Sequence, residues 1–282
     1  MTDIIHGMKI INVIENTEGK DGCIPIHGLS FYIETPSHKI LMDTGPSDQI
    51  IANAKNLGLD LEFVDTVILS HGHYDHSGGI LPFAGINDKA KIYMQIKAAD
   101  EYYAYDGPEL GYRYIGIDKL IPHLPSVCPL GGNFTLDDEV SLLVASDHPY
   151  PIPSTNGRLM RKVGEDYVAD DFSHEQNLVI TEGDKTVLLC GCAHNGILNI
   201  LDAFEERYGR MPDVVIGGFH LMRKAGETQE DIETAEDIAR ELTNFPSRFY
   251  TCHCTGTACY EVMKEIMGDQ LSYIRCGESL SI

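Results

Sequence analysis

The sequence is poor in basic residues and has no long apolar run. Its 282 residues include 43 Asp and Glu but only 21 Lys and Arg, so the formal net charge is −22 at pH 7. No cluster of Lys and Arg offsets this charge, and the chain would repel the phosphates of nucleic acids and of anionic membranes. No stretch reaches the roughly 18 apolar residues of a membrane span, and MTDIIHGMKIINVIE lacks the pattern of a signal peptide. We therefore expect a cytoplasmic protein that binds neither nucleic acid nor membranes.

Several common catalytic signatures are also missing. No GxSxG elbow, Walker loop or GxGxxG turn occurs between a strand and a helix, which excludes serine hydrolases, P-loop NTPases and Rossmann enzymes. Eight cysteines without a secretion signal predict free thiols or metal ligands instead of disulfides. A structural zinc or iron–sulfur cluster is an alternative, although the usual C-x-x-C spacing is absent. The cysteines weighed for such a cluster are Cys190, Cys192, Cys252, Cys254 and Cys259.

Apolar runs and turn residues predict an interleaved α/β chain that forms one domain over residues 1–282. Strands are expected at 8–15, 29–35, 39–45, 64–70, 90–95, 140–146, 177–183, 185–192, 213–220 and 248–254, and helices at 47–58, 78–85, 196–209, 228–242 and 258–268. Ser47 is expected to cap the first helix and Gly58 to end it, and Thr228 with Asp231 resembles a capping box. Residues 105–135 are rich in Gly, Pro and Tyr, and we expect a long connection that contacts substrate.

The densest group of metal-ligating side chains follows the apolar run 64–70. His71 and His73 alternate along an extended segment, so both rings can point to one side, while Asp75 and His76 can face a second position. Imidazole and carboxylate ligands suit zinc, iron or manganese, and two such ions about 3.5 to 4 Å apart can share a bridge. The sequence predicts two divalent transition metals, most readily zinc, with iron or manganese as alternatives. A surface loop with incidental histidines is the competing interpretation.

Three more histidines each follow an expected strand. They are His194 in VLLCGCAHNG, His220 in VVIGGFHLM and His253 in FYTCHCTG. Four ligands from one loop leave two metals short of a full coordination sphere, so at least two more must come from elsewhere. We expect His194 and His253 to be ligands and His220 to donate a proton or hydrogen bond to substrate, although His220 could also be a ligand. Cys192 is a further candidate ligand, and the alternative for it is a buried apolar cysteine.

These motifs carry a resemblance to a known family. HGHYDHSGG after an apolar strand, with MDTG at 42–45, resembles the signature of the metallo-beta-lactamase superfamily. HGLSFYIET, GCAHNGILNI, GGFHLM and CHCTG are similar to the branch of metal-dependent hydrolases related to dihydropterin ribofuranosyl-aminobenzene phosphate synthases. The resemblance implies an αββα sandwich of two mixed sheets flanked by helices, with a dinuclear site at one edge.

The resemblance also implies roles for individual residues. Asp43 would hold a ligand histidine in position without binding a metal itself. Where relatives such as glyoxalase II carry a bridging aspartate, this chain reads CGC, so Cys192 or His194 would take that place. His27 could line the pocket or lie on the surface.

The expected activity is that of a dinuclear metal-dependent hydrolase or transferase. A metal-activated hydroxide would attack an ester, thioester or phosphoester, or a phosphoribosyl substrate, in a small anionic molecule. Asp75 would ligate a metal and orient the nucleophile, and His220 would serve the leaving group. The alternatives are a non-catalytic metal-binding or sensing protein and a di-iron redox protein on the same fold.

Overall fold

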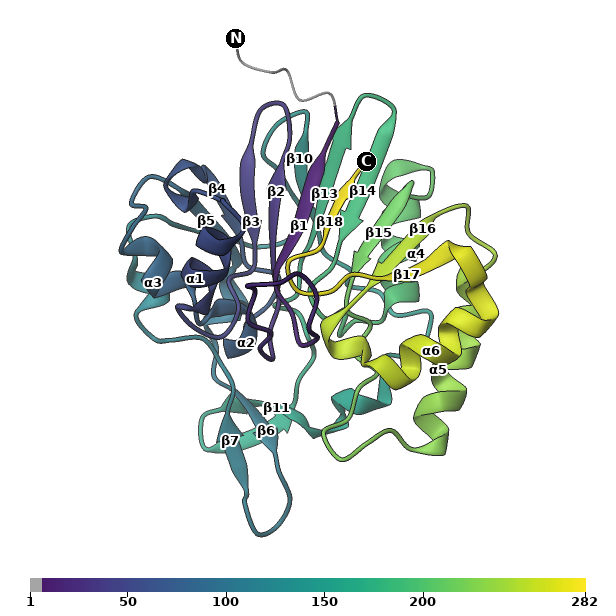
Figure 1. The fold of residues 1–282 in the computed structure, drawn as a ribbon. Coiled ribbons are helices and arrows are strands. Elements are labelled where there is room, and N and C mark those ends of the chain that lie inside the picture. Colours follow the sequence, from purple (N-terminus) through teal and green to yellow (C-terminus); the bar gives the residue numbers. More distant parts are fainter. Residues whose placement is uncertain (1–6) are drawn as a thin grey trace.

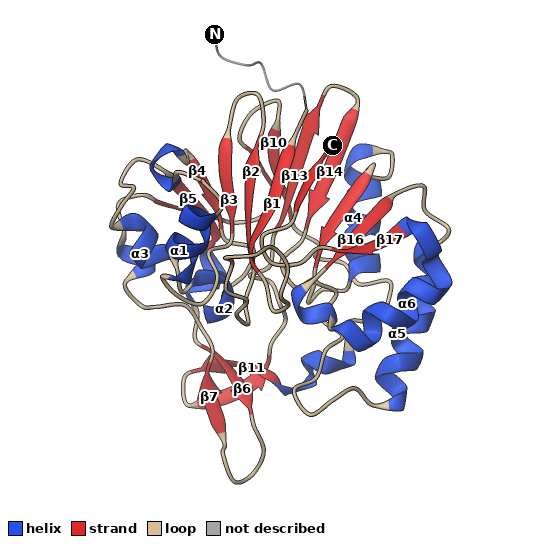
Figure 2. Cartoon of the chain, viewed as in Figure 1, coloured by secondary structure: helices blue, strands red, loops and turns tan. Residues whose placement is uncertain are grey.

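The protein is built from two large β-sheets that pack face to face between two layers of helices (Figure 1). A computed structural model describes residues 7–282. The expected αββα architecture is confirmed, and Figure 2 shows the strands in the middle with the helices on both outer sides. Within the described residues, no helix combines the length and the apolar character that a membrane crossing requires.

The first large sheet has the strand order β18-β1-β2-β3-β4-β5-β8. It begins as an antiparallel meander and continues with parallel pairs from β3 onward. The strand β18 near the C-terminus pairs with β1, which the sequence pattern did not predict. The bounds are β1 Lys9–Ile14, β2 Ser30–Glu34, β3 Lys39–Met42, β4 Thr66–Ile68, β5 Lys91–Gln95, β8 Val127–Leu130 and β18 Ser279–Ser281.

The second large sheet has the order β17-β16-β15-β14-β13-β10-β9. Strands β14 to β17 are parallel, so their carboxyl ends meet at one edge of the sheet. The bounds are β9 Phe134–Thr135, β10 Val140–Leu143, β13 Asn177–Glu182, β14 Lys185–Leu189, β15 Val214–Gly217, β16 Arg248–Thr251 and β17 Leu271–Tyr273.

Apolar residues fill both faces of the central strands, which is why their sequences read as continuous apolar runs. In β14, Val187 and Leu189 pack between the sheets, whereas Leu188 faces the helices outside. Helices α1 and α3 cover the first sheet, and α4, α5 and α6 cover the second. The α-helices are α1 Gln49–Asn56, α2 Tyr74–Ser77, α3 Ile80–Ala84, α4 Ile197–Tyr208, α5 Gln229–Leu242 and α6 Thr257–Met267; the 3-10 helices are η1 Leu61–Phe63, η2 Ile96–Ala99, η3 Ile121–His123, η4 Ser154–Arg158, η5 His253–Thr255 and η6 Gly268–Gln270.

The ends of two helices test the expected capping residues. Thr228 and Asp231 form a complete capping box at the start of α5, as predicted. At α1 the prediction was wrong, because Asp48 occupies the N-cap and Ser47 only accepts a hydrogen bond from the Gln49 backbone. This helix ends at Asn56, and Gly58 follows in a left-handed conformation with φ of +71°.

A small third sheet, with the order β12-β11-β6-β7, lies below the two large ones in Figure 1. Its strands are β6 Tyr102–Tyr105, β7 Tyr112–Tyr114, β11 Leu159–Val163 and β12 Asp166–Ala169. The long connection expected over 105–135 contains regular structure, since β7, β8 and β9 fall within that range. The strands of this sheet are short, and β6 and β7 consist mostly of tyrosines, so the burial of Tyr102 and Ala104 does not appear in the sequence as the apolar alternation that indicates a strand.

Candidate metal centre

The metal-ligating side chains meet at the carboxyl ends of strands from both large sheets. His71 follows β4, Cys192 and His194 follow β14, His220 follows β15 and His253 follows β16. Parallel pairing within each sheet, and face-to-face packing of the two sheets, bring these strand ends to one edge. A pocket of about 300 Å³ opens there and is closed on its far side by residues of the small sheet.

A first group of ligand atoms forms around His71 and His194. Their Nε2 atoms lie 3.3 Å apart, and the Cys192 Sγ lies within 4.8 Å of a ligand nitrogen of each. The ring of His73 is 4.6 Å from that of His71 and 4.9 Å from that of His194, measured between centroids. Three imidazoles from two separate sequence segments, two from the loop after β4 and one from the loop after β14, therefore surround one point.

A second group forms around His76 and His253. The Cys192 Sγ lies 3.2 Å from Nε2 of His76 and within 4.8 Å of a ligand nitrogen of His253. Asp75 places Oδ2 3.6 Å from Nε2 of His253 and 3.3 Å from Nε2 of His27. Cys192 is thus the one residue that belongs to both groups, and its sulfur lies between them.

The hydrogen bonds of His71 and His76 fix which ring nitrogen carries the proton. Asp43 accepts at Oδ2 from the Ser70 hydroxyl at 2.7 Å and from Nδ1 of His76 at 2.6 Å. Because the Ser70 hydroxyl donates to Asp43, its oxygen accepts from Nδ1 of His71 at 2.8 Å. Both rings therefore keep the lone pair on Nε2, the atom that faces the other ligands.

Two asparagines fix which ring nitrogen carries the proton in His194 and His253. Asn156 accepts from Nδ1 of His194 at 2.9 Å and donates through Nδ2 to the backbone oxygen of the same residue at 2.7 Å. Asn16 accepts from Nδ1 of His253 at 2.9 Å and donates to its backbone oxygen at 3.2 Å. Each asparagine holds its histidine at two points, so that Nε2 is unprotonated and directed at the cluster.

Unpartnered polar atoms show that the cluster fits a metal. Nε2 of His73, Nε2 of His253 and Nδ1 of His220 are buried and have no hydrogen-bond partner among residues 7–282. Unsatisfied buried nitrogens are costly in a folded protein unless a ligand satisfies them. Burial, and then neighbouring charges, lower the pKa of His73 to about 3 and of His253 to about 4. Burial lowers the pKa of His71 and His194 as well, so these four imidazoles are neutral at pH 7, which is the form that coordinates metals. At His76 burial would lower the pKa, but the Asp43 carboxylate outweighs it and raises the pKa.

Asp75 and Cys192 complete the set of donors. Burial alone would raise the pKa of Asp75, but His253 and His27 outweigh it and hold this pKa well below its usual range. Burial raises the pKa of the Cys192 thiol well above its usual value, so this thiol stays protonated until a cation stabilises the thiolate. Imidazoles together with one carboxylate and one thiol suit zinc, iron or manganese.

His220 lies at the same edge but has fewer contacts. Its ring is 4.1 Å from that of His194, and a ligand nitrogen lies within 4.8 Å of the sulfurs of Cys192 and Cys254. Burial and the neighbouring histidines lower its pKa to about 3. His220 is therefore neutral at pH 7, where it can donate a hydrogen bond through its N–H but holds no extra proton to release.

The backbone around the cluster is strained and tightly packed. Within residues 7–282, the non-glycine residues with a positive φ are Asp43, Phe172, Ala193, His220 and His253, and all lie at or next to the site. Such conformations cost free energy and persist only where the surroundings enforce them. A Cβ on Gly191 would clash with the Ser70 side chain, so glycine is required here for the two sheets to meet.

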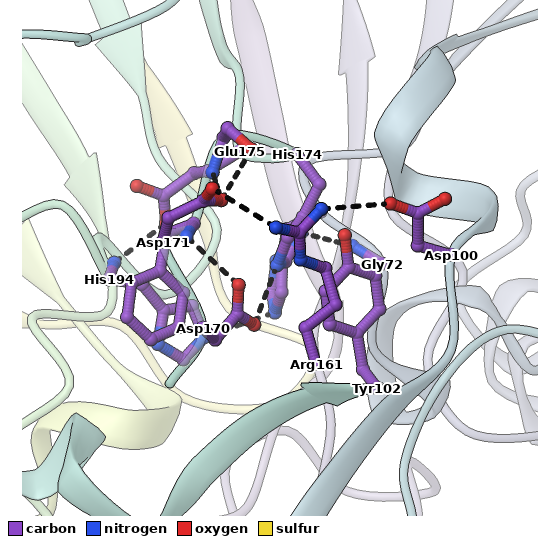
Figure 3. Close-up of polar contacts among 12 residues, drawn as sticks. Gly72, Asp100, Tyr102, Arg161, Asp170, Asp171, His174, Glu175 and His194 are labelled. Carbon is purple, nitrogen blue, oxygen red and sulfur yellow. Dashed lines mark hydrogen bonds and ion pairs between the residues drawn. The ribbon is translucent and has the colours of Figure 1, made fainter. Parts of the chain in front are cut away.

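Several buried polar residues that support the site were missed by sequence reasoning. Glu175 accepts from the backbone of His194 at 2.6 Å, and His174 accepts from the Gly72 backbone at 2.9 Å while its other nitrogen faces Asp170 (Figure 3). His174 and Glu175 precede β13, whereas the ligands follow strands, so only the clustering of His and acids in DDFSHE marked this segment.

Most of the expected site residues come together, and some do not. The structure brings together His71, His73, Asp75, His76, Cys192, His194, His220 and His253, and all of these except His71 and His76 line the pocket. His27 also lines this pocket, with 42% of its side chain exposed. Of the cysteines weighed as cluster ligands, Cys190 and Cys259 pack under the helices and Cys252 lies between the sheets, so the structure does not form that cluster.

The chain is similar in sequence to known proteins. The sequence model of the metallo-beta-lactamase superfamily matches residues 24–243. The chain is 25% identical over 299 residues to 7,8-dihydropterin-6-methyl-4-(beta-D-ribofuranosyl)-aminobenzene-5'-phosphate synthase of Methanocaldococcus jannaschii, covering 97% of this chain and 96% of that protein. An uncharacterized protein of the same organism is 30% identical over 204 residues, covering 70% of this chain and 73% of its own length.

A solved structure agrees with these matches. The crystal structure of a metal-dependent hydrolase of the beta-lactamase superfamily aligns with a TM-score of 0.81 at 26% identity, covering 98% of this chain and 99% of that one. Together these relatives support an enzyme with metal-dependent hydrolase or related activity. The chain belongs to the metallo-beta-lactamase superfamily.

Proposed function

We propose that this protein is a dinuclear metal-dependent hydrolase or transferase that acts on a small anionic molecule. One observation carries the proposal above the others. Four histidines from both sheets donate through Nδ1 to protein acceptors, which leaves four Nε2 lone pairs directed into one cluster. A structural role for these residues would pair the Nε2 atoms with protein donors, and Nε2 of His253 is left without one within residues 7–282.

Two sets of side chains would each hold one divalent transition metal, with zinc favoured and iron or manganese as alternatives. The first set is His71, His73 and His194, and the second is Asp75, His76 and His253. Cys192 lies between the two sets and is our candidate for the bridging position. Three protein ligands for each metal leave room for a substrate or water, as catalytic sites require.

The chemistry follows from what each residue offers. When bound, the two cations supply the Lewis acidity that activates water and polarises a substrate oxygen near neutral pH. Asp75 stays ionised and can accept a hydrogen bond from an attacking water. His220, being neutral, contacts the substrate or its leaving group through a hydrogen bond from its ring N–H.

Charge at the pocket supports an anionic substrate. Although the chain carries a net charge of −22, the pocket is lined by Arg113, Arg158, Arg223 and Lys224, with Asp75 as the carboxylate beside them. The synthase relative is named for a product with a sugar 5'-phosphate. We therefore place phosphoesters and phosphoribosyl compounds first among the candidate substrates, ahead of carboxylic esters and thioesters.

Two further parts of the proposal concern the whole chain. The two large sheets share one apolar interior, which supports a single domain over residues 1–282, of which 1–6 lie outside the described range. The acidic composition supports a protein without nucleic-acid partners, and a cytoplasmic location is part of the proposal.

A turnover screen of the metal-loaded protein tests the function. The panel comprises carboxylic esters, thioesters, phosphodiesters and phosphoribosyl donors, assayed with zinc, iron and manganese in turn. The matched variant is Asp75→Asn, which keeps the side-chain shape but removes the charge, and we expect its turnover to fall by about 10²-fold or more. Metal-loaded wild-type protein that turns over no compound on the panel would favour a binding or sensing role instead.

A further inference from the structure

A cationic cluster sits on the small third sheet, at the end of the pocket away from the large sheets. Arg113 on β7 places Nε 2.7 Å from Oδ2 of Asp106, and Arg158 at the end of η4 places Nη2 3.1 Å from Oδ1 of the same carboxylate. Both guanidinium groups line the pocket and keep 39% and 37% of their side-chain surface exposed. They are therefore fixed in position by Asp106 and still accessible to a ligand.

The charges in this cluster do not balance. Two guanidinium groups share one carboxylate, which leaves one uncompensated positive charge. Lys224 also lines the pocket, and its charge offsets that of Asp75 in the same lining, so the excess of one positive charge remains. Arg223 differs, because Asp231 pairs with it through two contacts of 2.6 and 2.8 Å. In a chain with a net charge of −22, excess positive charge at a pocket indicates an anionic ligand.

The cluster is coupled to the metal-ligand residues without being part of them. Asp106 holds the pKa of Arg113 above its usual value, and the negative charge of Asp75 adds to this effect. The charge of Arg158 adds in turn to the burial and neighbouring histidines that lower the pKa of His220. The backbone N–H of Tyr74, next to Asp75, donates to Ile115 of the small-sheet segment at 2.8 Å. Because both arginines and several metal ligands line the same pocket, one molecule can contact them together.

We propose that Arg113 and Arg158 form a binding subsite for the phosphate group of a phosphate monoester. The substrate is then a phosphorylated small molecule whose phosphate is bound but not cleaved, while its other end contacts the metal ligands. This rests on the proposed function. Two guanidinium groups spaced around one carboxylate present several N–H donors to the oxygens of a phosphate, which carries about 1.5 to 2 negative charges at pH 7. Arginine suits this geometry better than lysine.

Calorimetric titration with ribose 5-phosphate, and with ribose as the uncharged counterpart, tests the subsite. The full-length protein is titrated first with its metals and then after dialysis against a chelator, because metals also bind phosphate. In both forms we expect ribose 5-phosphate to bind and ribose to bind at least tenfold more weakly. Arg113→Met and Arg158→Met should each weaken binding of ribose 5-phosphate by about tenfold or more.

Arg240→Met is the matched control, because Arg240 pairs with Glu236 and Asp237 on the exposed face of α5 and is absent from the pocket. It should bind like wild type. Arg113→Lys and Arg158→Lys keep the charge and guard against misfolding, and we expect intermediate affinity. If binding disappears when the metals are removed, or if the arginine variants bind like wild type, the phosphate is held elsewhere and the subsite is refuted.

Metal content measured on the same samples separates this result from the proposed function. Two metals per chain with no arginine-dependent binding would refute the subsite alone. Arginine-dependent binding in a protein that cannot take up two metals would support the subsite and refute the dinuclear function.

Discussion

Replacing Asp43 by Asn isolates the contribution of one buried carboxylate to the metal centre. Asp43 is 1% exposed and lies directly after β3, where it accepts three hydrogen bonds. Oδ1 accepts from the Ser70 backbone at 2.7 Å, and Oδ2 accepts from the Ser70 hydroxyl at 2.7 Å and from Nδ1 of His76 at 2.6 Å. Its φ is 61°, and asparagine tolerates this conformation as well as aspartate does.

The size of the effect follows from these contacts. In Asp43→Asn, Oδ1 can still accept from the Ser70 backbone, but the new NH₂ group faces two donors. Losing two hydrogen bonds to a charged acceptor, each worth about 1.5 to 3 kcal/mol, should cost about 3 kcal/mol of unfolding free energy or more. His76 also loses the partner that orients its ring, so metal affinity should fall by about 10 to 100-fold.

Urea unfolding of metal-free protein measures the first quantity, and competition with a chelator of known affinity measures the second. Asp237→Asn is the control, because this side chain is 79% exposed on α5 and should change neither quantity. If Asp43→Asn binds metal within about threefold of wild type, Asp43 does not orient His76 and the tautomer argument for this histidine fails.

Other predictions concern parts of the molecule around and beyond the site. Glu175→Gln should lower the unfolding free energy by about 1 to 3 kcal/mol, because its NH₂ group would face a buried backbone donor, that of His194 or that of Asn195. Urea unfolding with excess metal measures this. His38 bridges Asp65 and Asp137, whose carboxylates outweigh burial and raise its pKa. This stabilisation is complete below about pH 6.5 and is lost as the pH rises through the raised pKa. Wild type should therefore exceed His38→Asn by about 1 kcal/mol near pH 6 and by much less near pH 9, as measured by urea unfolding; equal differences at both pH values would contradict the pairing. Finally, the chain should show no affinity for DNA or RNA in a gel-shift titration at about 0.15 M salt.

The sequence predicted the large sheets and the ligand histidines for related physical reasons. Strands buried on both faces must be apolar throughout, so runs such as 64–70 and 185–192 identify them. Parallel strands also bring their carboxyl ends together, and a histidine directly after each run, such as His71 or His194, is then expected at one edge. Both arguments use only local patterns and a general rule of sheet topology.

The residues that orient the histidines could not be predicted in this way. Asn16 contacts His253 across 237 positions of sequence, and Asn156 contacts His194 across 38. An asparagine in a polar loop carries no sign of its distant partner, and its role exists only after both sheets have packed. The small sheet was missed because its strands are short and rich in tyrosine, so the buried positions Tyr102 and Ala104 do not stand out from the exposed ones as an apolar alternation.

Elemental analysis of wild type beside three single variants tests the central claim most directly. Anaerobically purified and reloaded wild-type protein should contain about two transition metal ions per chain. His194→Ala and His253→Ala should each lower that content, because each removes the Nε2 lone pair that its asparagine directs at the cluster. His220→Ala should keep it near wild type. One metal or fewer in reloaded wild type, or a loss of metal in His220→Ala while His194→Ala and His253→Ala retain theirs, would contradict the dinuclear assignment.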